Sequence, residues 1–190
     1  MGYLLSSLWR IWFLIVFILV FIAFIPALFF FTAIDKNNKI VCHLTRYWSK
    51  LTLFFSFIYP SIEWEEKLDK KEHYIFCPNH VSTLDIPFVL AILPVPLQFM
   101  GKAEIAKIPL FGYFYKKNAV IVDRTNKRDA YAAFLKAGKQ LTNGLSVCFF
   151  PEGGIPKQDV FLKQFKNGPF RLAVEQNIKI VPITIPDNKY

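Results

Sequence analysis

The segment "YIFCPNHVSTLDIP", residues 74–87, decides the fold because it joins a buried strand to a helix through a short polar turn. Its first four residues are apolar and suit a strand, which Pro78 then interrupts. Ser82 or Thr83 can cap a following helix that reaches Leu93. The segment therefore predicts a strand, a turn and a helix, which is one repeat of an α/β domain.

The rest of the chain continues this alternation. Short apolar runs predict strands at His73–Cys77, Leu97–Gly101, Ala119–Asp123, Ser146–Phe150 and Ile178–Ile185. Helical periodicity lies between them, with one helix capped at Thr125 and stopped by Gly144, and another over Asn167–Gln176. The pattern predicts an α/β domain, residues 63–190, whose largely parallel sheet is flanked by helices.

The N-terminal part has a different composition. The run Ile11–Ile34 carries no charge and is long enough to cross a bilayer as a helix of about 1.5 Å rise per residue. Pro26 should kink or break this helix, and the apolar stretch Leu51–Ile62 suits a helix at the membrane interface. We expect residues 1–62 to form a retained membrane-associated helical hairpin: either one span plus an interfacial helix, or a hairpin in a single leaflet.

Charge indicates the side of the membrane and the class of partner. The formal net charge is +9, which suits anionic phospholipids, and no basic tract or motif typical of nucleic-acid binding is present. Basic residues follow the apolar run at Lys36, Lys39, Arg46 and Lys50, whereas only Arg10 precedes it. This asymmetry places the α/β domain at the cytoplasmic face of the cell's inner membrane. The three cysteines lack C-x-x-C spacing, which favours buried free thiols.

His80 and Asp85 are the candidate catalytic pair. His80 lies in the turn after the first strand of the α/β domain, and Asp85 falls in the first turn of the next helix, where the helix dipole favours a carboxylate. From there Asp85 can accept a hydrogen bond from the imidazole and hold it in one tautomer. The spacing alone also fits an ordinary loop histidine beside a capping aspartate.

Further motifs favour the catalytic interpretation of His80 and Asp85. "NHVSTLD" has the N-H-x4-D pattern of the glycerolipid acyltransferases, and later stretches resemble that family in the same order: "GKAEIAKIPLFGYF" (101–114), "AVIVDR" (119–124), "FFPEGG" (149–154) and "IVPITI" (180–185). The resemblance covers about residues 70–187. The chain is identified as a member of the 1-acylglycerol-3-phosphate acyltransferase family, with residues 63–190 as its acyltransferase domain.

The resemblance implies transfer of a fatty acyl group from acyl-CoA or acyl-carrier protein to the hydroxyl of a lysophospholipid, most simply 1-acyl-sn-glycerol-3-phosphate. His80 would remove the hydroxyl proton and Asp85 would stabilise the imidazolium. A thioester is already activated, so we expect no cofactor and no metal site. Cys77 lies near the loop, but strand-end cysteines are usually inert.

The resemblance also implies an acceptor site. Arg124 would bind the acceptor's phosphate, Glu152 and Gly153 would belong to the same site, and Lys102 and Lys166 are secondary candidates for the phosphate. Glu152 would bind substrate hydroxyls or brace Arg124. Asp123 would position Arg124 or cap the turn. The chain departs from the family at 154–155, where Gly-Ile replaces the usual Thr-Arg.

This missing cation leaves alternatives open. Lys157 could substitute for it, or the acceptor could be a lyso-ornithine-type lipid or glycerol 3-phosphate. A non-catalytic lipid-binding membrane protein is the alternative from another class. We expect membrane lipids as partners in every case, and no nucleic acid.

Overall fold

The computed structural model describes residues 2–156, 160 and 162–186, with the side chains of residues 2–4 excepted. Contacts divide the chain into two compact units. The first comprises Met1–Glu66 and Ile86–Leu93, and the second comprises Lys67–Asp85 and Pro94–Tyr190. The helical segment 86–93 therefore groups with the N-terminal residues rather than with the sheet.

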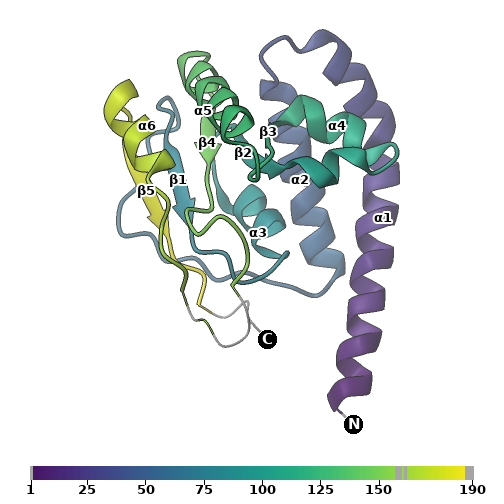
Figure 1. Cartoon of the computed structure of the whole chain (residues 1–190). Helices are drawn as coiled ribbons and strands as arrows, with labels where there is room; N and C mark the ends of the chain where they lie inside the picture. The colour runs from purple at the N-terminus through teal and green to yellow at the C-terminus, as the bar shows by residue number, and fades with distance from the viewer. Residues whose placement is uncertain (1, 157–159, 161, 187–190) are drawn as a thin grey trace. The chain divides into compact units, whose positions relative to one another are not determined.

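The first unit contains an antiparallel helical hairpin (Figure 1). Helix α1, Gly2–Ile34, packs along α2, Lys39–Phe55. The indole N–H groups of Trp9 and Trp12 donate to the carbonyls of Ser56 (3.2 Å) and Phe55 (2.9 Å), so the start of α1 meets the end of α2. Among the described helices, α1 alone is long and apolar enough to cross a membrane, judged by length and composition.

Two details of the hairpin differ from the sequence expectation. Pro26 lies inside α1 without breaking it, because loss of one backbone donor is tolerated in a long apolar helix. The second helix begins at Lys39 rather than near residue 51, and it ends at Phe55 rather than reaching Ile62. The early start follows from Asp35, whose carboxylate accepts from the N–H groups of residues 40 and 41 and so satisfies the helix's first donors.

The described residues of the second unit form a five-stranded parallel sheet in the order β3-β2-β4-β1-β5. Its strands are β1 (Ile75–Pro78), β2 (Leu97–Lys102), β3 (Ala119–Val122), β4 (Ser146–Cys148) and β5 (Ile180–Ile183). The predicted α/β class with a parallel sheet and flanking helices is confirmed. Four of these strands are shorter than expected, and β2 is one residue longer. Pro78 lies inside β1 at its end rather than interrupting the strand, because β1 still pairs with β5 at that residue.

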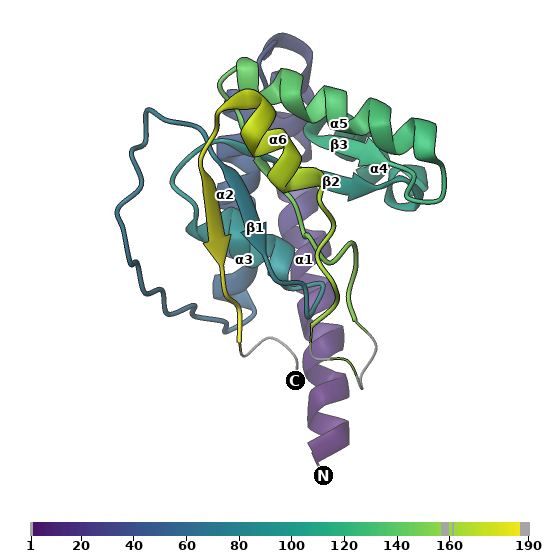
Figure 2. The same cartoon turned by 60° about the vertical axis from the view of Figure 1, so that its left-hand side comes forward.

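Helices α5 (Lys127–Thr142) and α6 (Gly168–Gln176) lie side by side across one face of the sheet (Figures 1 and 2). The buried core between them and the strands consists of Ile75, Cys77, Val120, Val122, Ala133, Ala137, Leu141, Val147, Phe149, Leu172 and Ala173. Asn126, not Thr125, caps α5 by accepting from the N–H of Arg128, because Thr125 is engaged in a turn with Asp123. Two elements were not foreseen: the 3-10 helix η1 (Ala103–Lys107) and helix α4 (Phe111–Asn118).

Candidate active site

The predicted site residues follow the carboxyl ends of the parallel strands. His80 follows β1, Lys102 ends β2, Arg124 follows β3, and Glu152 follows β4. Parallel strands present these ends at one edge of the sheet, where ligands of open α/β sheets bind. The topology thus brings four separate stretches of sequence to the same edge.

His80 and Asp85 are in direct contact. Nδ1 of His80 lies 2.9 Å from Oδ2 of Asp85, which opens helix α3 (Asp85–Ile92). The same oxygen accepts from the backbone N–H groups of Val81 (2.8 Å) and Ser82 (2.9 Å). Asp85 has no exposed surface, whereas 12% of the His80 side chain is exposed. A buried carboxylate therefore fixes the ring through Nδ1 and leaves Nε2 as the nitrogen that can face a substrate.

The loop that carries His80 is fixed by Asn79. Its side-chain amide donates to the carbonyl of Ile185 (3.0 Å), and its side-chain oxygen accepts from the N–H of the same residue (2.7 Å). These two bonds close a contact between segments more than a hundred residues apart. Sequence reasoning quoted Asn79 as part of a motif but did not foresee this role, because no local signal names its partner.

Phe150 is a second residue that sequence reasoning missed. Its ring stacks on the imidazole of His80, with centroids 3.9 Å apart and planes 18° from parallel, and Phe99 stacks behind it at 5.8 Å. The stack restricts ring rotation about the axis that the Asp85 hydrogen bond leaves free. The only signal was the aromatic pair that precedes Pro151, which is unremarkable in a chain with 21 phenylalanines.

Glu152 braces the His80 loop. One carboxylate oxygen accepts from the N–H of His80 (2.7 Å) and the other from the N–H of Lys163 (3.0 Å), and only 3% of the residue is exposed. The expected bond to Arg124 is absent from the described hydrogen bonds. Buried carboxylates need such donors, and both oxygens here are engaged by backbone groups. Glu152 therefore ties the loop after β1 to the segment that follows β4.

Arg124 and Lys166 meet at the turn formed by Gly153 and Gly154. Arg124 donates to the carbonyl of Gly153, and the N–H of Lys166 donates to the carbonyl of Pro151 (2.9 Å). A Cβ at Gly153, whose φ is +74°, would lie 2.9 Å from Nζ of Lys166. The backbone conformation of the turn favours glycine, and a side chain at this position would also displace the end of the Lys166 side chain.

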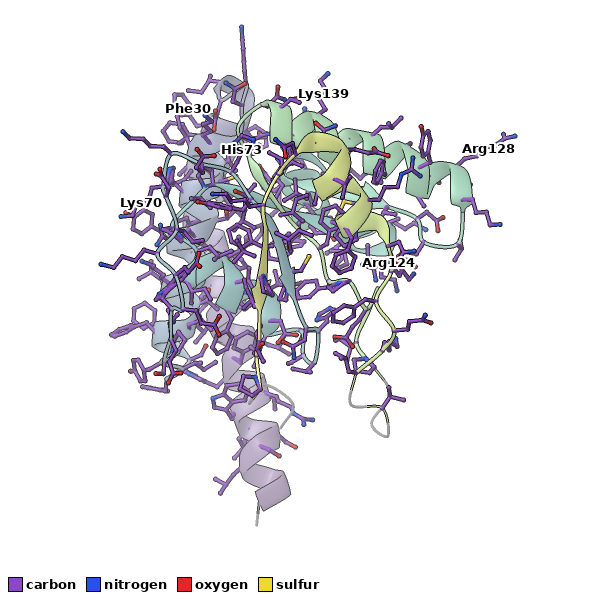
Figure 3. All side chains as sticks on the ribbon, turned by 90° about the vertical axis from the view of Figure 1, so that its left-hand side faces the viewer. Phe30, Lys70, His73, Arg124, Arg128 and Lys139 are labelled. Carbon is purple, nitrogen blue, oxygen red and sulfur yellow. The ribbon has the colours of Figure 1, made fainter. Side chains whose placement is uncertain are left out.

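These two cations line a cavity of about 190 Å³ between the sheet edge and the beginnings of α5 and α6. In Figure 3 the labelled Arg128 and Lys139 mark the two ends of α5, and Arg124 lies on the Arg128 side. The cavity is lined by Met100, Val122, Arg124, Ala130, Phe134, Phe149, Phe150, Pro151, Gly153, Lys166, Gly168 and Pro169. It is apolar apart from two cations and a helix start, which suits an amphiphile with an anionic group.

A lysine lies next to residues 154–155, where the family's usual arginine is absent. Nζ of Lys163 lies 3.1 Å from the carbonyl of Ile155 and 3.4 Å from that of Gly154. It therefore brings a positive charge next to the backbone of these two residues. Lys157, the substitute considered from sequence, lies outside the described residues.

Lys102 is placed differently from the other cations. Its ammonium pairs with Glu104 at 3.3 Å, more than half of the side chain is exposed, and it is not among the residues that line the cavity. Tyr115 lies against neighbouring Gly101, and burial raises the pKa of this tyrosine to about 12. Asp123 caps the turn by accepting from Thr125, and these hydrogen bonds lower the pKa of its carboxyl group.

Cys77 and Cys148 are both buried in the sheet. Burial raises the pKa of the Cys77 thiol to about 11 and that of Cys148 well above its ordinary value. A thiol with so high a pKa is a poor nucleophile near neutral pH. No group of three His, Cys, Asp or Glu side chains that could hold a metal occurs among the described residues.

Comparison with known proteins gives a consistent result. A putative 1-acyl-sn-glycerol-3-phosphate acyltransferase of Caenorhabditis elegans is 30% identical over 80% of this chain and 53% of its own length. A 1-acyl-sn-glycerol-3-phosphate acyltransferase of Borreliella burgdorferi is 28% identical over 72% of this chain and 54% of its own. This chain spans about half the length of these curated relatives.

A solved structure has the same fold. The crystal structure of the 1-acyl-sn-glycerophosphate acyltransferase PlsC of Thermotoga maritima matches with a TM-score of 0.77 at 23% identity, covering 100% of this chain and 77% of that one. The family model described as Acyltransferase matches residues 60–186, which contain every candidate site residue. The chain therefore belongs to the acyltransferase family.

Proposed function

We propose that this protein is an O-acyltransferase that moves a fatty acyl group from acyl-CoA or acyl-carrier protein to the free hydroxyl of 1-acyl-sn-glycerol-3-phosphate, giving phosphatidic acid. The single observation that carries the proposal is the contact between His80 and the wholly buried Asp85. The relatives named as 1-acyl-sn-glycerol-3-phosphate acyltransferases support the choice of acceptor.

The proposed reaction needs a base and charge stabilisation. Nε2 of His80 takes the proton from the acceptor hydroxyl as that oxygen attacks the thioester carbonyl, and Asp85 stabilises the imidazolium that forms. The tetrahedral intermediate then collapses, the carbon–sulfur bond breaks, and the imidazolium returns the proton to the leaving thiolate. No covalent acyl-enzyme is required, which agrees with the high pKa of Cys77.

The acceptor's phosphate is assigned to Arg124 and Lys166. An arginine fork matches phosphate oxygens in two places at once, and Lys166 adds a point charge beside the first turn of α6. Phe150 lines this cavity and also stacks on His80, so an acceptor held by its phosphate would lie next to the proposed base. Glu152 acts in this proposal by holding the His80 loop, not by binding substrate hydroxyls.

Membrane association is supported by the length and composition of α1, whose segment Leu5–Ile34 contains an 18-residue window with a mean hydropathy of 3.1. An amphipathic acceptor would be taken directly from the bilayer. The basic residues that follow α1 support a cytoplasmic position for the α/β domain.

The test is a panel of acceptors on the full-length purified protein, with thiol release as the readout. The proposal expects release with acyl thioester and lysophosphatidic acid, and a rate roughly a hundred- to ten-thousandfold lower in the His80→Ala variant. Release only with a lyso-aminolipid would overturn the acceptor assignment. No release with any acceptor and both donors would favour a lipid-binding protein without catalytic activity.

A further inference from the structure

A second cavity, of about 350 Å³, lies within the first unit, and none of the residues that line it belongs to the candidate active site. Its size is typical of a small-molecule site. It is lined by Arg46, Lys50, Leu53, Phe54, Ile58, Tyr59, Pro60, Ile62, Ala91 and Ile92. The lining comes from the second half of α2, the extended segment after it, and the end of α3, and we call it the hairpin groove.

The two cations of the hairpin groove share one side of α2, because they are four residues apart in a helix. Nε of Arg46 donates to the carbonyl of Ala91 at 3.4 Å, a bond that holds the guanidinium in place. Neither terminal amino group of Arg46, nor the ammonium of Lys50, has a hydrogen bond or an acidic partner among the described residues. Two cations remain available for one anion.

The rest of the groove is apolar and open. Phe54 and Tyr59 meet edge to face with centroids 6.2 Å apart, and both are more than half exposed. Phe57, between them in sequence, is 70% exposed. An exposed aromatic surface of this size is unusual in a soluble domain. The same unit contains the long apolar helix α1, so lipid is a suitable cover for this surface.

We propose that the hairpin groove binds one anionic phospholipid, with its phosphate held by Arg46 and Lys50 and its first methylenes against Leu53 and Phe54. Charge complementarity selects an anion, and the apolar lining selects a lipid over a free phosphate. This site is separate from the acceptor site assigned to Arg124. The proposal does not depend on the proposed reaction, since its test measures binding.

The experiment counts lipids on the full-length protein in a neutral detergent by native mass spectrometry, with phosphatidylglycerol and phosphatidylcholine titrated separately. The Arg46→Gln/Lys50→Gln variant is compared with Lys36→Gln/Lys39→Gln, which removes the same charge from the same unit outside the groove. We expect one tight phosphatidylglycerol per wild-type chain and about thirtyfold weaker binding in the groove variant, from about 1 kcal/mol per basic residue. The control pair should change affinity less than threefold.

Each other outcome has a defined meaning. Equal losses in the two paired variants would show general charge attraction and overturn the site, as would equal affinity for the two lipids. Displacement of the lipid by inorganic phosphate at the affinity of phosphatidylglycerol would show a free-phosphate site and overturn the lipid assignment. If thermal unfolding shows that the double variant is unstable, the exposed Lys50→Gln change alone is compared with Lys36→Gln by the same criteria.

Discussion

Replacing Asp85 with asparagine isolates the charge of the proposed catalytic pair. Asparagine has the same shape, and its side-chain oxygen can still accept from the N–H groups of Val81 and Ser82, so the loop should keep its conformation. What it loses is the negative charge beside the imidazole. The variant therefore tests whether stabilisation of an imidazolium limits the rate.

The separation of 2.9 Å between His80 and Asp85 sets the magnitude. Two unit charges at that distance, with an effective dielectric constant of about 20, attract by roughly 5–6 kcal/mol. If the proton is fully transferred at the transition state, losing this attraction slows the reaction about ten-thousand-fold. If the proton is half transferred, the loss is about a hundredfold.

The assay is steady-state thiol release, with kcat and KM measured for Asp85→Asn, His80→Ala and the double variant. Because Asp85 is proposed to act through His80, the double variant should be no slower than His80→Ala alone. A folded Asp85→Asn protein with kcat within tenfold of wild type would refute the assignment. If the double variant is slowed by the product of the two single-variant factors, Asp85 acts independently of the imidazole.

Three further predictions concern the same edge of the sheet. Arg124→Ala should raise KM for lysophosphatidic acid about ten- to a hundredfold, because a charged hydrogen bond contributes about 1.5–3 kcal/mol. KM for a lyso-aminolipid should stay nearly the same. The control Arg128→Ala, at an exposed position, should change KM for neither acceptor. Equal effects on both acceptors would contradict the phosphate assignment. Gly153→Ala should lower the melting temperature, because a side chain is strained at a φ of +74°. It should also weaken lysophosphatidic acid binding, because the added Cβ would lie 2.7 Å from Cε of Lys166 and displace that side chain. An unchanged melting temperature and an unchanged KM would contradict this argument. Cys77→Ala should keep activity within about twofold, and iodoacetamide at pH 7.5 should leave Cys77 unmodified in the native protein, because a pKa of about 11 leaves roughly one thiol in three thousand ionised. Since burial raises this pKa from 9.0, the stability gained from the neutral thiol is complete below pH 9 and is lost as the pH rises through 11, which a melting series across that range would detect.

Local signals were sufficient for much of the fold. The strand, turn and helix around His80 were predicted from the apolar run and the polar turn after it, because these signals act over a few positions. The finer signals were less accurate: Pro78 lies inside β1, and α3 begins at Asp85 rather than directly after Ser82 or Thr83. The alternation of runs was likewise enough for a parallel sheet. The expected break at Pro26 does not occur, since α1 continues through it, and α2 begins earlier than expected because Asp35 accepts from its first backbone donors.

The contact between His80 and Asp85 could also be predicted from local signals, since the turn and the helix start bring together two side chains that are five residues apart. The long-range partners of the His80 ring and loop could not be predicted in this way. Phe150 and Glu152 are about seventy residues from His80 in the sequence. Nothing in the sequence near His80 specifies which strand will lie beside it, so these partners could not be named in advance.

The amino-acid sequence by itself determined the apolar N-terminal helix, the α/β class and the contact between His80 and Asp85, because hydrophobic periodicity and the geometry of a short turn depend on near neighbours. Only the tertiary structure decided that Glu152 accepts from the backbone of His80 and Lys163, that Lys166 lies against Gly153, and that Lys102 lies outside the cavity. The reason is the strand order β3-β2-β4-β1-β5, which sets the neighbours of every loop at the sheet edge and is not a local property of any segment.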